Sequence, residues 1–435
     1  MEERKLRVLW ICNLMPAFAG RALGLEGTNK EGWIEGISKL IRQNNEYTFA
    51  VAFPIKPDGT HEEMRREVDN VRYYGFLEDN GKEEKYDKAV ESSLGLICEE
   101  FSPDVIQIYG TEFAHCLAML RIKEWKSKVI VHMQGLMQAC ADAYFANLPN
   151  EVVERSTFRD TLKHDSIWQQ KDKFMRRADN EREALMLAEY VCGRTAFDKD
   201  YISGINSKCR YFTVNETLRP VFYDKKWDIN ACNRHTIFVS QGNYPLKGLH
   251  FVIEAVARLR DKYKDIKLVV AGDKITAYKT LKDKLKISSY GKYLMELIKK
   301  NNLEDVVSFT GQINDVEMTK CFLDAGVFVL ASVMENSPNS LGEAMIMGVP
   351  AVTSRVGGIP SLAEDEKEVL MYEKADVDGM IRQIERVFND DELVLGLSEN
   401  ARLRAALTHD PVANYKMLGW VYRSVANQEQ ELTFS

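Results

Sequence analysis

The chain has 435 residues, of which 45% are hydrophobic and 28% are charged, and this balance excludes a disordered protein. It carries 58 Lys and Arg against 65 Asp and Glu, so its net charge of −7 argues against a broad nucleic-acid-binding surface. At about 100–200 residues per domain, the length predicts two or three domains.

The cysteines and the N-terminus indicate the cell compartment. The 8 cysteines are scattered and include no C-x-x-C pair, which argues against a zinc site or a redox pair. The first apolar run, Val8–Cys12, is followed at once by Asn13 and is too short for a signal peptide. No run approaches the roughly 20 apolar residues that span a bilayer. We therefore expect a cytoplasmic protein with reduced thiols.

Apolar, β-rich runs alternate with helical patterns such as Lys30–Arg42 and Tyr86–Phe101 along the first half of the chain. Strand runs that are apolar throughout indicate a parallel sheet covered on both faces. Their alternation with helices indicates a doubly wound α/β domain. The strands expected here are Leu6–Cys12, Phe49–Phe53, Val105–Tyr109, Val129–Met133 and Tyr190–Cys192.

The same alternation restarts after a polar, irregular stretch at Asn206–Asn233. We therefore divide the chain into domains at 1–206 and 207–410, and expect 411–435 to carry a helix that packs on the N-terminal domain. Ligands of such sheets bind at the carboxyl ends of the strands, so a cleft between the domains is the expected site. The second set of strands is Thr236–Ser240, Lys267–Ala271, Val306–Phe309, Val327–Leu330 and Pro350–Thr353.

Residues 138–187 interrupt the pattern, because they are helical in character and contain no convincing strand. Connections of this length are typical of lids and binding elements. Within them Lys171–Arg177 is basic and lies near Trp168, which would suit peripheral contact with an anionic membrane. The balanced charge of Glu151–Leu187 favours an ordinary solvated helix face instead, and both readings stay open.

The phosphate-binding loops of simple dehydrogenases and P-loop enzymes are absent from the sequence. The most informative stretch is Val333–Pro360, VMENSPNSLGEAMIMGVPAVTSRVGGIP, in which seven residues separate Glu335 from Glu343. A helix expected to begin near Ser340 would offer its N-terminus to a diphosphate, and a carboxylate beside it could bind a ribose diol. A simpler reading makes Ser340 and Glu343 a capping box.

Glu335-x7-Glu343, followed by GEAM-x-x-G-V-P-A-V and VGGIP, resembles the signature of the retaining glycosyltransferases of family 4, the group 1 glycosyltransferases. The resemblance extends to Ser240–Glu254 (SQGNYPLKGLHFVIE), to Cys192–Asp198 (CGRTAFD) and to His132–Gly135. It implies the GT-B architecture, an α/β fold of two doubly wound Rossmann-like domains facing across a cleft.

The resemblance also implies roles for individual residues. Lys247 would neutralise the donor diphosphate, Glu335 would contact the transferred sugar, and Glu343 would bind the ribose hydroxyls. His132 would lie near the donor sugar. Further donor-binding residues would be Gln241, Gly242, Asn336, Ser337, Asn339, Ser340 and Leu341, and a flexible donor and acceptor loop would contain Gly27, Thr28 and Asn29.

Two features depart from the family pattern. The family carries an Arg five or six residues before the lysine as a second diphosphate ligand, where this chain has the uncharged Gln241 and Gly242. Arg194 or Arg219 is a candidate substitute. Pro338 also removes one backbone N–H donor from the loop after Glu335.

The implied reaction transfers a hexosyl or N-acetylhexosaminyl unit, with retention, from a nucleoside-diphosphate sugar to a hydroxyl acceptor. A UDP-sugar is favoured, the acceptor would be a saccharide or lipid-linked saccharide, and the context would be cell-surface polysaccharide or glycolipid synthesis, in the cytoplasm or at the inner face of the membrane. No metal and no cofactor is required, and Asp376-Val-Asp378 is read as surface. Alternatives are a GT-B sugar-nucleotide epimerase and a degenerate nucleotide-sugar-binding protein.

Overall fold

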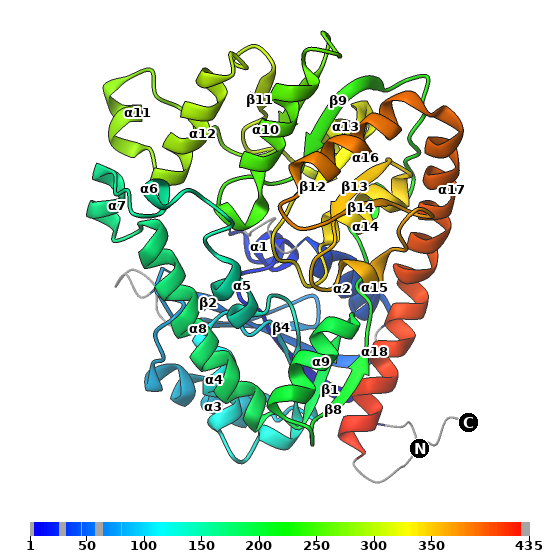
Figure 1. Cartoon of the computed structure of the whole chain (residues 1–435). Helices are drawn as coiled ribbons and strands as arrows, with labels where there is room; N and C mark the ends of the chain where they lie inside the picture. The colour runs from blue at the N-terminus through cyan, green and yellow to red at the C-terminus, as the bar shows by residue number, and fades with distance from the viewer. Residues whose placement is uncertain (1–3, 26–31, 45, 57–63, 80, 428–435) are drawn as a thin grey trace. The chain divides into compact units, whose positions relative to one another are not determined.

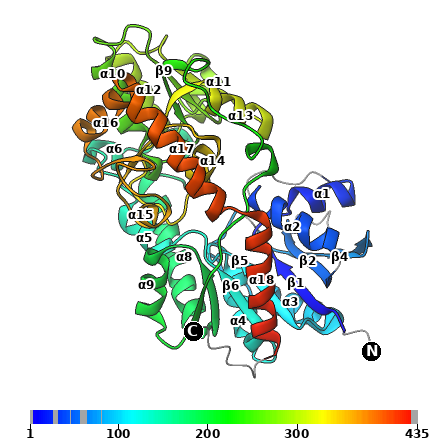
Figure 2. The ribbon, with the colours of Figure 1, turned by 90° about the vertical axis from the view of Figure 1, so that its right-hand side faces the viewer.

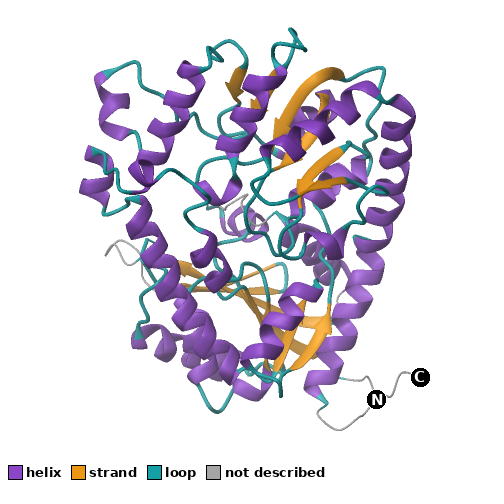
Figure 3. Ribbon diagram, in the orientation of Figure 1, coloured by secondary structure: helices purple, strands orange, loops and turns teal. Residues whose placement is uncertain are grey.

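The structure is a computed structural model that describes residues 4–25, 32–44, 46–56, 64–79 and 81–427 (Figure 1). The chain forms two compact units. Unit 1 comprises Met1–Gln138, Met175–Arg219 and His409–Ser435, and unit 2 comprises Ala139–Phe174 and Pro220–Thr408. Each unit is built on one β-sheet whose strands are connected mainly through helices (Figure 3).

The sheet of unit 1 has 8 strands in the order β3-β4-β2-β1-β5-β6-β7-β8, and all neighbours are parallel except β3 and β4. The five strands expected in the first half are confirmed. The bounds are β1 (Leu6–Ile11), β2 (Tyr47–Ile55), β3 (Met64–Val68), β4 (Val71–Leu77), β5 (Val105–Tyr109), β6 (Val129–His132), β7 (Tyr190–Gly193) and β8 (Arg210–Thr213).

Helices of unit 1 are α1 (Ala17–Leu23), α2 (Trp33–Asn44), α3 (Lys88–Phe101), α4 (Ala114–Arg121), α9 (Ala196–Ile205) and α18 (Pro411–Ala426). Helix α18 runs beside the strands of this sheet (Figure 2). Its Tyr422 hydroxyl accepts a hydrogen bond of 2.8 Å from Nε1 of Trp10 on β1 and donates one to Oε1 of Gln107 on β5. The last helix is therefore part of the core of unit 1.

The sheet of unit 2 has 6 parallel strands in the order β11-β10-β9-β12-β13-β14. The five expected strands are confirmed, and β14 is an additional one. The bounds are β9 (Asn233–Val239), β10 (Lys267–Val270), β11 (Val307–Phe309), β12 (Ala325–Leu330), β13 (Ala351–Ser354) and β14 (Leu370–Tyr372).

Unit 2 also contains most of the helices. They are α6 (Asn150–Val153), α7 (Phe158–Lys163), α10 (Leu249–Leu259), α11 (Leu281–Lys286), α12 (Ser289–Lys300), α13 (Asp315–Asp324), α14 (Asn339–Met347), α15 (Ile359–Leu362), α16 (Val377–Asn389) and α17 (Asp391–Thr408). Two further helices, α5 (Met137–Ala143) and α8 (Ile167–Leu187), begin in one unit and end in the other.

The segment 138–187, which we expected as an insertion of the first domain, is helical as the sequence indicates. The structure groups its part Ala139–Phe174 with unit 2. The physical reason is a set of specific contacts. Nε2 of His250 on α10 lies 2.9 Å from the carbonyl oxygen of Ala146, and the Thr157 hydroxyl donates to the carbonyl of Ile287 at 2.8 Å.

In the described part of the chain, no helix combines the length and the apolar character that crossing a membrane requires. The cysteines are free, and Cys12, Cys98, Cys116 and Cys192 are buried. Burial raises the pKa of the Cys98 thiol to about 12, so this thiol stays protonated and unreactive at neutral pH.

Candidate functional site

Two loops follow neighbouring strands of unit 2 and bring Lys247 and Glu335 together. Lys247 ends the short 3-10 turn Pro245–Lys247 after β9, and Glu335 lies in the loop after β12. Nζ of Lys247 donates to Oε1 of Glu335 at 2.5 Å, and the Ser332 hydroxyl donates to the same oxygen at 2.7 Å. The two residues that the sequence assigns to diphosphate and sugar thus form one ion pair at the carboxyl edge of the sheet.

The charge of Lys247 is maintained by its neighbours. Burial alone would lower the pKa of this ammonium, but the carboxylate of Glu335 and the Tyr244 hydroxyl raise it, and the net pKa lies above its ordinary value. Lys247 is therefore a fixed cation at neutral pH. A compact ammonium of this kind suits the binding of phosphate oxygens.

Glycines allow three loops to meet around this pair. Gly248 has φ +67°, and a Cβ there would lie 2.0 Å from the carbonyl oxygen of Ala331. Gly357, after β13, has φ +50°, and its Cβ would lie 1.9 Å from the carbonyl oxygen of Glu335, which also accepts from the Gly358 N–H at 3.1 Å. The KG and VGGIP motifs are therefore needed for close backbone contact beside the ion pair.

Helix α14 begins with Asn339, one residue earlier than expected, and its N-cap is Pro338, which makes no side-chain cap. The capping-box reading of Ser340 and Glu343 is therefore wrong, because Ser340 already lies inside the helix. Glu343 lies one turn further on and is buried. The ribose-binding role of this buried carboxylate stays a prediction.

The remaining donor-site candidates occupy different environments. Asn336 and Ser337 are buried in the loop before α14, and Leu341 is a core residue whose N–H bonds to the carbonyl of Pro338 at 3.1 Å. Asn339 and Ser340 are partly exposed in the first turn of α14, Gln241 is exposed, and Gly242 is buried against the side chain of Leu249. The backbone N–H of Leu341 is therefore already used within the protein.

His132 lies in unit 1, at the end of β6, and is buried. Tyr422 donates to Oε1 of Gln107, so the Gln107 amide nitrogen, 3.1 Å from Nδ1 of His132, acts as the donor to that atom. This assignment leaves the proton of the neutral imidazole on Nε2, which lies 3.6 Å from Oε1 of Glu216. Burial and the nearby Arg194 lower the pKa of His132 to about 3.

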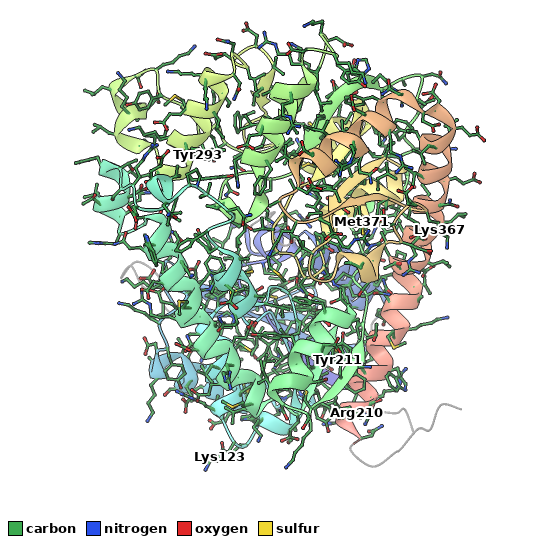
Figure 4. The ribbon with its side chains drawn as sticks, viewed as in Figure 1. Lys123, Arg210, Tyr211, Tyr293, Lys367 and Met371 are labelled. Carbon is green, nitrogen blue, oxygen red and sulfur yellow. The ribbon has the colours of Figure 1, made fainter. Side chains whose placement is uncertain are left out.

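Arg194, a candidate substitute for the missing diphosphate arginine, forms a buried ion pair of 2.9 Å with Glu216 within unit 1. Its backbone N–H donates to Asp198, whose carboxylate also accepts from the Tyr211 hydroxyl at 2.6 Å. Tyr211 is labelled in Figure 4. The CGRTAFD motif thus builds a buried polar network. Arg219 packs against Gly32, where an added Cβ would lie 2.5 Å from Cδ of the arginine.

Two carboxylates of unit 1, the buried Glu181 and the partly exposed Glu112, were not predicted. Glu181 on α8 accepts from the hydroxyls of Thr111 (2.5 Å) and Tyr201 (2.6 Å) and from the N–H of Met137 (3.0 Å), and burial raises its pKa to about 7. Glu112 accepts from the N–H of Gly135 at 2.6 Å. Both hold the turn after His132. In the sequence Glu181 belongs to a charged helical run, EREAL, and nothing distinguishes it from a solvated residue.

Other predictions concern loops and metal ligands. Gly27, Thr28 and Asn29 lie outside the described residues. Asp376 caps α16 by accepting from the N–H of Gly379 at 2.9 Å, and Asp378 pairs with Arg258, so both aspartates have ordinary structural functions. Within the residues that the structure covers, no cluster of His, Cys, Asp and Glu could hold a metal ion.

Comparison with known proteins agrees with this geometry. Residues 222–404 match the family model of Glycosyl transferases group 1. The chain is similar to the putative colanic acid biosynthesis glycosyltransferase WcaL of Escherichia coli, 31% identical over 144 residues, which cover 32% of each chain. It is also similar to the putative glycosyltransferase YtcC of Bacillus subtilis, 30% identical over 225 residues, which cover 51% of this chain and 52% of YtcC. The matched part thus spans about a third to a half of these relatives.

Among solved structures, Anabaena Alr3699/HepE in complex with UDP matches with a TM-score of 0.64 over 96% of this chain and 100% of that chain, at 14% identity. This likeness, together with the two doubly wound parallel sheets, confirms the GT-B fold. The resemblance of the motifs to group 1 glycosyltransferases is also confirmed, and the matched residues contain Lys247, Glu335 and Glu343. Residues 222–404 are therefore the part of this chain that is similar to the group 1 glycosyl transferases.

Proposed function

We propose that the protein is a retaining glycosyltransferase that transfers a hexosyl or N-acetylhexosaminyl unit from a nucleoside-diphosphate sugar to a hydroxyl acceptor. The observation that carries the proposal is the ion pair of Lys247 and Glu335 at the carboxyl edge of the unit 2 sheet, beside the start of α14. A fixed ammonium and a helix N-terminus are the two features that a diphosphate requires.

Each residue has a separate task in this proposal. Lys247 and the N-terminus of α14 stabilise the charge that grows on the leaving diphosphate. Glu343 binds the ribose hydroxyls, and Glu335 binds hydroxyls of the transferred sugar with the carboxylate oxygen that Lys247 and Ser332 do not use. His132 is neutral, so it adds no charge near the donor sugar.

The proposed mechanism is a same-face substitution. The bond from the anomeric carbon to the diphosphate breaks, the acceptor oxygen forms its bond on the same face, and the leaving phosphate oxygen takes the acceptor proton. Glu335 accepts two hydrogen bonds from its own protein, which supports a positioning task rather than nucleophilic attack. The protein contributes positioning and charge stabilisation, and the scheme uses neither a metal nor a cofactor.

UDP is the favoured nucleotide, because HepE is similar in fold and was crystallised with UDP. A saccharide or lipid-linked saccharide is the proposed acceptor, in cell-surface polysaccharide or glycolipid synthesis, because WcaL is named for colanic acid biosynthesis. The localisation that accompanies this proposal is the cytoplasm or the inner face of the membrane.

Thermal-shift titration tests the donor site. The purified protein would be titrated with UDP, GDP, ADP and their sugar conjugates, beside Lys247→Ala and Glu343→Ala. A ligand that binds only the folded state raises the melting midpoint by mass action. We expect one nucleotide class to raise it and both variants to lose the shift. If no nucleotide changes the melting midpoint, the proposal is contradicted. Incubation of the binding sugar nucleotide with hydroxyl acceptors then separates transfer from isomerisation and from binding without reaction.

A further inference from the structure

Two short helices of unit 2 repeat one sequence pattern. Thr157–Lys163 reads TFRDTLK and contains α7, and Thr280–Lys286 reads TLKDKLK and contains α11. In both, the threonine caps the helix and the aspartate three residues later completes a capping box. The apolar residues occupy the first and fifth helical positions, four residues apart, and therefore lie on one face of each helix.

These apolar side chains are presented to solvent. The exposed fractions are 61% for Phe158, 70% for Leu162, 75% for Leu281 and 45% for Leu285. Single exposed apolar residues are ordinary, but two pairs, each on one face of a short helix, form a surface that needs an explanation.

The two helices are held together as one body. The Thr157 hydroxyl donates to the carbonyl of Ile287, directly after α11, at 2.8 Å. The buried carboxylate of Asp160 accepts from the N–H of Ser289 at 2.9 Å, and the Ser289 hydroxyl donates to the carbonyl of Arg155 at 2.8 Å. Figure 1 shows α7 and α11 as neighbours at one end of unit 2. We call them, with their four apolar residues and the surrounding lysines, the α7–α11 surface.

The α11 part of this surface is rich in lysine, although the whole chain has a net charge of −7. Between Lys274 and Lys300 there are 8 lysines, no arginine and only two acidic residues, Asp283 and Glu296. Asp283 is used in the capping box of α11, and Glu296 pairs with Arg155 at 2.8 Å. The exposed lysines of the surface are Lys163, Lys279, Lys282, Lys284 and Lys286.

We infer that the α7–α11 surface docks the protein on the surface of an anionic lipid bilayer. The four apolar side chains enter the headgroup region, and the lysines contact anionic headgroups around them. Lysines on flexible stems suit diffuse headgroup charge, whereas recognition of carboxylates on a partner protein favours the bidentate geometry of arginine. An acidic protein is therefore the alternative occupant that the test must separate.

This surface differs from the basic stretch Lys171–Arg177 that the sequence singles out. Lys171 lies over the ring of Phe145 at 4.3 Å, and Lys173 lies 3.9 Å from Asp165. Arg177 donates to the carbonyl of Glu112 at 2.7 Å. These side chains are engaged within their own units, so the lysines around α11 are the better candidates for lipid contact.

Vesicle flotation of the full chain tests the inference. Vesicles of phosphatidylcholine alone are compared with vesicles that contain about 30% phosphatidylglycerol, at about 0.1 M salt. We expect at least tenfold more protein on the anionic vesicles. Phe158→Ser with Leu281→Ser should lower binding about tenfold, and Lys282→Gln with Lys286→Gln should lower it about 25-fold, at roughly fivefold per lysine.

Leu403→Ser with Leu407→Ser is the matched control, because these leucines of α17 are 61% and 79% exposed but lie outside the α7–α11 surface. It should float like the unchanged protein. Equal binding to neutral and anionic vesicles would overturn the inference, and so would unchanged binding of both variants. Absence of binding to anionic vesicles would also overturn it, and binding of an acidic protein in that case would identify the alternative occupant. The nucleotide-induced thermal shift checks the fold of every variant and tests the donor site separately.

Discussion

Glu335 follows Lys247 by 88 residues and accepts a hydrogen bond of 2.5 Å from its ammonium. The cation proposed for the donor diphosphate is therefore already neutralised by a carboxylate of the same unit. A diphosphate that binds Lys247 must share the ammonium with Glu335, and two anions near one cation repel each other. This competition has a measurable consequence for each partner.

We predict that Glu335→Gln separates binding from transfer. Loss of the negative charge should tighten UDP binding about tenfold, or ~1.4 kcal/mol, while transfer falls at least 100-fold because the sugar loses a charged contact. Calorimetric titration with UDP and a transfer assay measure the two effects. Lys247→Ala, the matched variant of the other partner, should instead lose UDP binding. Weaker UDP binding by Glu335→Gln would contradict the predicted competition.

A second prediction concerns Glu343, which is buried in α14. If its carboxylate holds the ribose diol, Glu343→Gln should weaken UDP binding about tenfold to 100-fold and leave inorganic pyrophosphate unaffected, since hydrogen bonds to a charged group contribute about 1.5–3 kcal/mol. The Kd values of both ligands, measured on one preparation, give the answer. An equal loss for both ligands would instead indicate damage to the helix.

The third prediction concerns the close contact between Gly248 and Ala331. A methyl group at Gly248 would meet the Ala331 carbonyl oxygen at 2.0 Å, in backbone with φ +67°. Gly248→Ala should therefore destabilise the protein by at least about 2 kcal/mol and lower the melting midpoint. Gly396→Ala in α17 is the control, because nothing lies within 4 Å of its Cβ, and it should be neutral or stabilising by up to about 1 kcal/mol. Equal midpoints for the two variants would refute the contact.

Much of this fold could be predicted because its parallel strands are short apolar runs separated by helical patterns. The strands β3 and β4 were missed, since MRREV is a polar edge strand and turns back through Asp69 and Asn70, both at positive φ. Strand β3 pairs only with β4, in the antiparallel direction, and its polar sequence offers no apolar run to recognise.

The sequence predicted more of the candidate site residues in unit 2 than in unit 1. Lys247, Glu335 and Glu343 stand in recognisable motifs, but their mutual contacts depend on loops from separate strands, and the sequence alone does not reveal the ion pair. In unit 1, Glu181 becomes distinctive only through its burial and its hydroxyl partners on other elements. The capping-box reading failed for a local reason, because Pro338 occupies the cap position itself.

The fourth prediction concerns the tautomer of His132. Tyr422 orients the amide of Gln107, which donates to Nδ1 of His132. Tyr422→Phe would free this amide to turn, and the imidazole proton could then move to Nδ1. We expect kcat to fall about tenfold with an unchanged Kd for UDP.

Nitrogen chemical shifts of the imidazole would report the tautomer directly. Tyr415→Phe on the same helix, where Tyr415 packs against the ring of Tyr47, is the matched control. Unchanged imidazole shifts in Tyr422→Phe would rule out the positioning role of Tyr422.

The fifth prediction concerns pH and His250. Burial lowers the pKa of His250 to about 4, below the ordinary value of 6.5, although the Ala146 carbonyl partly opposes the shift. The unfolded chain therefore binds more protons between these values, so the contribution of His250 is complete above pH 6.5 and is lost as the pH falls towards 4. At pH 5 this loss is about 2 kcal/mol relative to neutral pH.

Denaturation midpoints at about pH 7.5 and pH 5 measure this slope for the unchanged protein and for His250→Gln. The difference between the two midpoints should shrink in the variant. An unchanged difference would show that other groups, such as His409, whose pKa burial also lowers to about 4, account for the acid sensitivity.

The chain passes between the two units four times, after Gln138, Phe174, Arg219 and Thr408. Trp10 and its partner Tyr422 are 412 residues apart, so the core of unit 1 cannot close until almost the whole chain has left the ribosome. Unit 2 can close somewhat earlier, because its last segment ends at Thr408, before α18 begins. During synthesis, one apolar face of β1 and β5 therefore stays uncovered until α18 has been made. A cell that makes this protein has to protect that face from aggregation.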